Sequence, residues 1–60
     1  MEIQKEDIIE VAETLNITLT ETEIDNVLSI YESEADNDPT ATWDLVVENC
    51  IYNVINDREN

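Results

Sequence analysis

The sequence is short of the residues that most enzymes use for chemistry. Its 60 residues include no histidine, no glycine, one cysteine and one proline, and its cations are one lysine and one arginine. General acid–base catalysis most often uses histidine, zinc sites use histidine and cysteine, and phosphate-binding loops are rich in glycine. We therefore expect a protein that is not an enzyme and that needs no cofactor and no metal.

The lone cysteine and the lack of long apolar runs bear on location. Cys50 cannot close a disulfide within the chain, and a single thiol is typical of a reducing compartment. No stretch approaches the ~18 apolar residues of a membrane span. The first residues are acidic, where a secretory signal would be basic and then apolar. These observations favour a cytoplasmic protein.

Acidic and aliphatic side chains dominate what is present. Sixteen Asp and Glu residues give a formal net charge of −14, which repels nucleic acid and anionic lipid. Hydrophobic residues make up 42% of the chain, too many for an acidic disordered tail. A chain of this length has room for one core, so we expect residues 1–60 to form a single helical domain.

Apolar residues recur with helical spacing in three segments. Without glycine the chain lacks the usual hairpin turns, so a sheet is disfavoured. Spacings of three and four residues predict helices over about 5–15, 21–34 and 39–56. The apolar stripes are Ile8, Val11, Ala12 and Leu15; then Ile24, Val27, Leu28 and Tyr31; then Trp43, Val46, Val47, Cys50, Ile51, Val54 and Ile55. Short connections favour a compact, antiparallel three-helix bundle.

Three local signals place the helix boundaries. Asn16 tolerates a left-handed conformation and can end the first helix. Thr20 and Glu23 have the spacing of a capping box, which predicts the start of the second. Asp38 followed by Pro39 predicts the start of the third, because proline is favoured at the first helical position.

The placement of the acids suggests a binding face. Three glutamates lie opposite the apolar stripe of the first helix, where like charges repel, and two lie in the last turn of the second, where the helix dipole disfavours anions. The candidate partner-binding residues are Glu6, Glu10, Glu13, Glu32, Glu34, Asp36 and Asp38. One interpretation is a decoy whose carboxylates stand where phosphates would lie on a basic protein. The other is a surface that serves only solubility.

Three apolar residues lie off the stripes. Leu45 and Tyr52 fall on the far side of the third helix, and Ile30 lies off the main stripe of the second. Isolated exposed hydrophobic residues are normal. We nevertheless expect the three side chains to form the interface of a twofold homodimer, built through the third helix, because a small core gains from added burial. An alternative function follows, namely a structural or assembly protein whose main partner is itself.

One stretch resembles a known group of proteins. Residues 38–48, with the sequence DPTATWDLVVE, and the following Ile51 and Tyr52 resemble the carboxy-terminal part of short uncharacterised acidic proteins of phages and other mobile elements. The resemblance covers about a third of the chain and includes no catalytic motif. It implies a small inhibitor of host machinery, of the anti-defence type, in a group that includes dimers and DNA mimics. The partner would then be a basic host or viral protein in the host cytoplasm.

Overall fold

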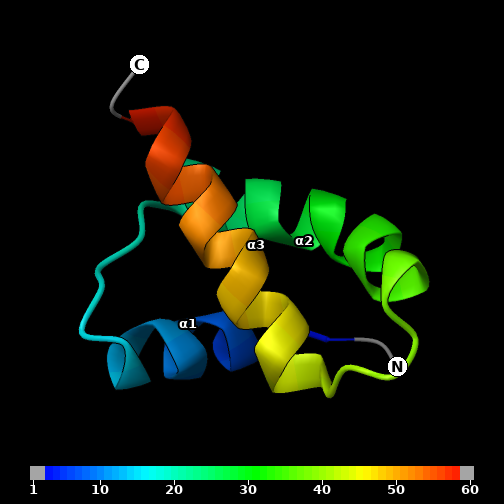
Figure 1. Ribbon diagram of the computed structural model, residues 1–60. Helices are drawn as coiled ribbons and strands as arrows, with labels where there is room; N and C mark the ends of the chain where they lie inside the picture. The colour runs from blue at the N-terminus through cyan, green and yellow to red at the C-terminus, as the bar shows by residue number, and fades with distance from the viewer. Residues whose placement is uncertain (1–2, 59–60) are drawn as a thin grey trace.

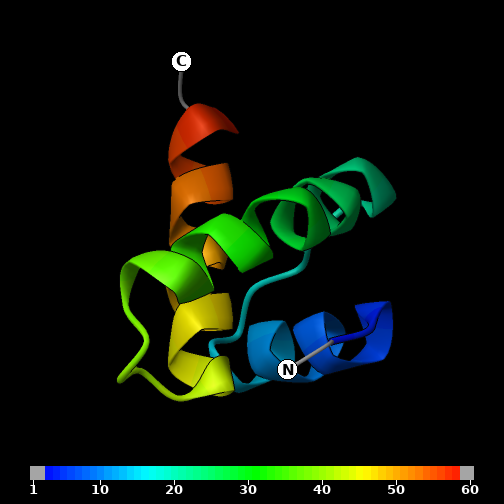
Figure 2. The ribbon, with the colours of Figure 1, turned by 90° about the vertical axis from the view of Figure 1, so that its right-hand side faces the viewer.

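The computed structural model describes residues 3–58, which form three helices and no strand: α1 (Lys5–Thr14), α2 (Glu21–Asn37) and α3 (Trp43–Arg58). The expected all-α three-helix bundle is confirmed. The helices cross one another steeply and do not lie side by side along their lengths (Figures 1 and 2). The antiparallel arrangement expected from the sequence is therefore not found. Residues 15 and 16 form a turn, and residues 17–20 then form an extended connector, which at about 3.3 Å per residue lets α2 begin well away from the end of α1. No helix in the described range is long and apolar enough to cross a membrane.

Each helix contributes one face to the core, as the periodicity predicted. Ile8 of α1, Val27 of α2, and Val47, Cys50 and Ile51 of α3 are completely buried. The remaining buried hydrophobic residues are Ala12, Ile24, Tyr31, Val46 and Val54. Burial raises the pKa of the Cys50 thiol to about 11, with a smaller contribution from the negative charge of Glu34.

Helix α1 is closed at both ends by backbone hydrogen bonds. At its start, the Gln4 amide donates to the Asp7 carboxylate at 2.9 Å. At its end, Asn16 has a φ of 60°, so the predicted left-handed stop is confirmed. The Ile17 amide donates to the Ala12 carbonyl and the Asn16 amide to the Glu13 carbonyl. These two bonds are those of a Schellman motif, which turns the chain into the connector.

Helix α2 begins with the predicted capping box and ends later than expected. The Glu23 amide donates to the Thr20 hydroxyl at 3.2 Å, and the Thr20 amide donates to the Glu23 carboxylate at 2.9 Å. The helix continues to Asn37, three residues beyond the predicted end. It stops there because a proline disfavours the α conformation in the residue before it, and Asp38 adopts φ −135° and ψ 78°.

The predicted start of α3 at Pro39 is wrong. Asp38 closes the end of α2 instead: its amide donates to the Glu34 carbonyl at 3.2 Å, and its own carbonyl accepts from the Ala41 amide at 3.1 Å. Pro39 therefore lies in a turn and acts as a helix stop. Helical bonding resumes only where the Val46 amide donates to the Thr42 carbonyl.

Both cations of the sequence form ion pairs between segments. The Arg58 guanidinium pairs with the Glu23 carboxylate and donates to the Thr18 carbonyl at 2.9 Å, which ties the end of α3 to the start of α2. This pairing and the capping bonds from Thr20 lower the pKa of Glu23 to about 2. The Lys5 ammonium lies 3.2 Å from the Asp25 carboxylate, in an exposed pair between α1 and α2.

Candidate functional site: an acidic groove between α1 and α3

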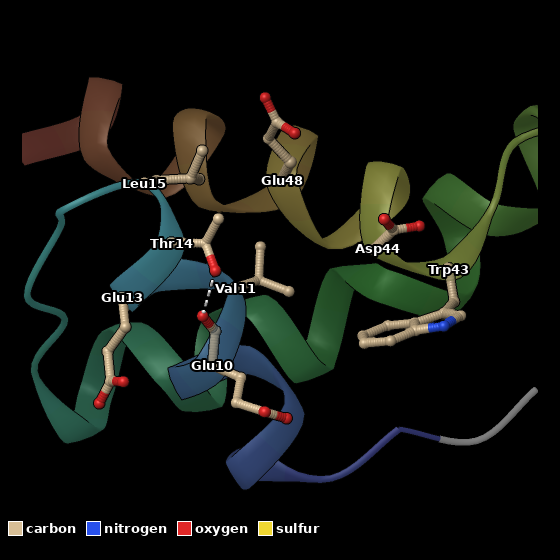
Figure 3. A pocket seen from close by; sticks show the side chains of 8 residues that line it. All are labelled: Glu10, Val11, Glu13, Thr14, Leu15, Trp43, Asp44 and Glu48. Atoms are coloured by element: carbon tan, nitrogen blue, oxygen red, sulfur yellow. Dashed lines mark hydrogen bonds between the residues drawn. The ribbon is translucent and has the colours of Figure 1, made fainter.

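A groove of about 600 Å³ lies between the second half of α1 and the first half of α3 (Figure 3). Its floor is apolar and its edges are acidic. The lining residues are Glu10, Val11, Glu13 and Thr14 of α1, Leu15 directly after it, and Trp43, Asp44 and Glu48 of α3. Both the position and the composition of the groove follow from the way α3 crosses α1.

The floor consists of side chains that sequence periodicity assigned to the core. Val11 lies in the last turn of α1, Leu15 directly follows that helix, and Trp43 is the first residue of α3. All three pack against the core and remain half-buried. Figure 3 shows Val11 in the middle, with the Trp43 indole toward one end and Leu15 toward the other. Because α3 crosses α1 steeply, it leaves these apolar surfaces partly uncovered.

Carboxylates stand on both sides of this floor. Glu10 and Glu13 come from α1, and Asp44 and Glu48 come from successive turns of α3. Figure 3 places Glu10 and Glu48 on opposite sides of Val11. The Thr14 hydroxyl donates to the backbone carbonyl of Glu10, so this bond does not occupy the Glu10 carboxylate.

The acidic edge of α3 is held by the start of the helix. Hydrogen bonding with Thr42 and with the first backbone amides of α3 lowers the pKa of Asp44, with the Thr42 bond the largest cause. A carboxylate in the first turn is also favoured by the helix dipole. Asp44 therefore stays ionised at neutral pH, and Glu48 one turn later extends the same negative edge.

The described lining of the groove contains four carboxylates and no cation. Lys5 and Arg58 are engaged elsewhere, with Asp25 and Glu23. Carboxylates accept hydrogen bonds and attract cations, and the floor offers apolar contact. In the described part of the chain, no cluster of three or more His, Cys, Asp or Glu residues is arranged to hold a metal ion. The arrangement is therefore suited to a cationic group that is attached to an apolar one.

The candidate acids from the sequence fall into two separate places. Glu10 and Glu13 line the groove, and Glu6 is exposed on α1 outside it. The other four lie at the end of α2 and in the turn that follows: Glu32, Glu34, Asp36 and Asp38. Figure 1 shows that end of α2 at the right of the molecule, opposite the end of α1. Glu34 is partly buried, and the Asp38 carboxylate accepts a bond from the Thr40 hydroxyl at 3.0 Å.

The three candidate interface residues also separate. Leu45 and Tyr52 are 46% and 49% exposed on the outer side of α3. Ile30 is partly buried and lines a smaller hollow between α2 and α3, together with Asn53 and Asp57. At 100° per residue, Asn53 lies about 80° further round α3 than Leu45. Leu45 and Tyr52 thus share one exposed side of α3, whereas Ile30 lies next to a different side of that helix, the one that carries Asn53 and Asp57.

Sequence reasoning missed half of the acidic groove. It assigned Trp43 to the core and gave no role to Asp44 and Glu48. A signal was present, because two acids four residues apart on α3 share a side of the helix. That signal could not show which other helix the acids would face, since this depends on how α1 and α3 cross.

Comparison with protein-family models, with curated proteins and with solved structures found no match to the chain. The resemblance of residues 38–52 to acidic phage proteins therefore stays a prediction, and the function is argued from the geometry of the groove.

Proposed function

We propose that this protein is a non-enzymatic acidic binding protein that docks on a basic surface of another protein. The observation that carries the proposal is the groove, where four carboxylates from two helices surround a partly uncovered apolar floor. The two cations of the chain are paired at other places. The negative charge at the groove is thus left for a partner to neutralise.

The charge distribution favours binding over solubility alone. Solubility requires charge of either sign spread over the surface, and mixed signs serve it well. Here the net charge is −14, and the acids of α1 and α3 are brought to the same groove. Such a surface accelerates association with a basic partner by electrostatic steering. It also repels nucleic acid and anionic membranes, so the expected partner is a protein.

Surfaces that bind nucleic acid are strongly basic, because they neutralise phosphates with lysine and arginine. An acidic protein that covers such a surface acts as a decoy, with carboxylates where phosphates would lie. The resemblance of residues 38–52 adds that the decoy is a phage-type inhibitor of a host defence or nucleic-acid-binding protein, acting in the host cytoplasm.

The experiment is capture from a bacterial lysate at 50 mM and 500 mM sodium chloride, followed by a displacement assay on each captured protein. We expect a basic nucleic-acid-binding protein that is retained at low salt, is lost at high salt and releases its bound duplex DNA when this protein is added. Capture that is insensitive to salt, or bound DNA that stays in place, would contradict the proposal.

The second candidate function is self-assembly through α3, with the charge serving solubility. It is favoured by one observation: Leu45 and Tyr52 leave about half of their surfaces exposed on the same side of α3. The two functions respond oppositely to salt. Screening weakens attraction between an acidic and a basic protein, whereas it relieves repulsion between two copies of an acidic one.

A further inference from the structure

We infer that the groove between α1 and α3 binds a short segment of the partner that carries one large apolar side chain flanked on both sides by lysine or arginine. This inference rests on the proposed function and adds which surface makes the contact and what chemistry it recognises. It differs from a pure phosphate mimic, which would need carboxylates and no apolar floor.

The size and the apolar floor of the groove favour binding of an apolar group at its centre. Its volume of about 600 Å³ is in the range of pockets that enclose small ligands, so it has room for one or two large side chains. Val11, Leu15 and Trp43 are half-buried by the protein itself. An apolar side chain seated on them would remove the remaining apolar surface from water, which is favourable.

The charges on the two edges call for cations on both sides of that central group. Glu10 and Glu48 stand on opposite sides of Val11, and Asp44 lies beside Trp43 (Figure 3). One cation alone would leave one edge unsatisfied. Lysine and arginine residues on either side of the apolar anchor meet both edges, and a guanidinium near the Trp43 ring also gains a cation–π contact.

A second copy of this chain is a poor occupant. Its lysine and arginine already pair with Asp25 and Glu23, so using them would break these two ion pairs. Two copies would also bring net charges of −14 together. The charge complementarity of the groove therefore points to a different protein.

The test uses Trp43, the only tryptophan of the chain, as a fluorescent reporter inside the groove. Two capped nine-residue peptides without aromatic residues serve as probes. Both carry four lysines, two on each side of the centre, with alanine elsewhere; one has leucine at the centre and the other has serine. We expect the leucine peptide to shift the Trp43 emission at 20 mM sodium chloride and to bind at least about tenfold more tightly than the serine peptide, because it buries one leucine side chain.

Two charge-matched variants locate the site. Glu10→Gln with Glu48→Gln removes two charges at the groove, and Glu32→Gln with Glu34→Gln removes two at the end of α2. The first pair should weaken binding of the leucine peptide by about tenfold, which corresponds to two exposed charge contacts, and the second pair by less than about threefold. Val11→Thr, which keeps the shape of the side chain, should reduce the preference for leucine over serine. Calorimetric titration of the same variants measures the affinity without reliance on Trp43.

The outcomes separate this inference from the proposed function. Equal affinity for the two peptides, or equal weakening by both charge pairs, would overturn the inference and leave salt-dependent binding of a basic protein in place. Failure of the lysate capture together with tight binding of the leucine peptide would overturn the decoy function and support the groove. A stronger effect of the pair at Glu32 and Glu34 would move the site to the end of α2 and refute the assignment.

Discussion

Exposed apolar residues on α3 allow a quantitative prediction about self-association. Leu45 is 46% exposed and Tyr52 is 49% exposed. Full burial of a large apolar side chain is worth about 1.5–3 kcal/mol, so covering the exposed half supplies about 1 kcal/mol per residue. A twofold interface made of these residues in two copies therefore gains about 4 kcal/mol.

That gain is too small to hold a dimer by itself. A dissociation constant of about 1 mM already needs about 4 kcal/mol of net free energy, after a cost of at least about 4 kcal/mol for lost translational and rotational freedom. Repulsion between two chains of net charge −14 adds to the cost. In contrast to the homodimer expected from the sequence, this estimate predicts a monomer at 50 µM in 50 mM sodium chloride, as measured by light scattering after size-exclusion chromatography.

A pair of variants extends this measurement. Leu45→Ser combined with Tyr52→Ser should still give the mass of a monomer by light scattering. Ile51→Val in the core should lower the melting temperature by about 4–8 °C, because it removes one buried methylene worth about 1 kcal/mol from a small domain. A dimeric mass for the wild-type chain that becomes monomeric in the serine variant would refute the estimate. It would then support a homodimer through Leu45 and Tyr52.

Three further predictions concern charge and burial. The melting temperature at pH 7 should rise between about 10 mM and 500 mM sodium chloride, because screening relieves repulsion among the acids; a flat or falling curve would count against it. Arg58→Gln should lower the melting temperature most near neutral pH. The pKa of Glu23 is about 2 in the folded protein and 4.5 ordinarily. The stability that the ionised carboxylate contributes is therefore complete above pH 4.5 and is lost as the pH falls from 4.5 to 2. The melting temperatures of the wild-type chain and the Arg58→Gln variant should therefore converge as the pH falls over this range. A difference between them that stays constant would contradict the Arg58–Glu23 ion pair. The Cys50 thiol, fully buried with its pKa raised to about 11, should resist a thiol reagent at pH 8 until urea unfolds the protein; rapid labelling of the folded chain would contradict its burial.

Local chemistry made much of the fold predictable. The capping box at Thr20 and the left-handed stop at Asn16 depend on side chains within a few residues of one another, and both are found as predicted. The apolar stripes identified the buried residues of each helix because a helix presents one face to the core.

Pro39 shows where local reasoning was ambiguous. A proline after aspartate fits the start of a helix, but it also restricts the residue before it, and here the second effect decides the structure. The helical pattern of α2 carries on through the acids to Asn37, and only then does the proline interrupt it. Thr42, which precedes Trp43 and whose carbonyl accepts a helical hydrogen bond from the Val46 amide, was the better signal for the start of α3.

The groove depends on how distant segments meet. The periodicity correctly predicted that Val11 and Trp43 face the core. Whether another helix covers them fully depends on the angle at which α3 crosses α1. The ion pair between Arg58 and Glu23, which are 35 residues apart, also depends on how distant segments meet. No spacing rule relates residues so far apart in sequence.

The most direct test of the acidic groove is a heteronuclear NMR titration of the ¹⁵N-labelled protein with the leucine-centred lysine peptide at 20 mM sodium chloride. We expect the largest chemical-shift changes at the backbone amides of residues 10–15 and 43–48 and at the indole N–H of Trp43. Changes centred on residues 32–38, or spread evenly over the three helices, would contradict it.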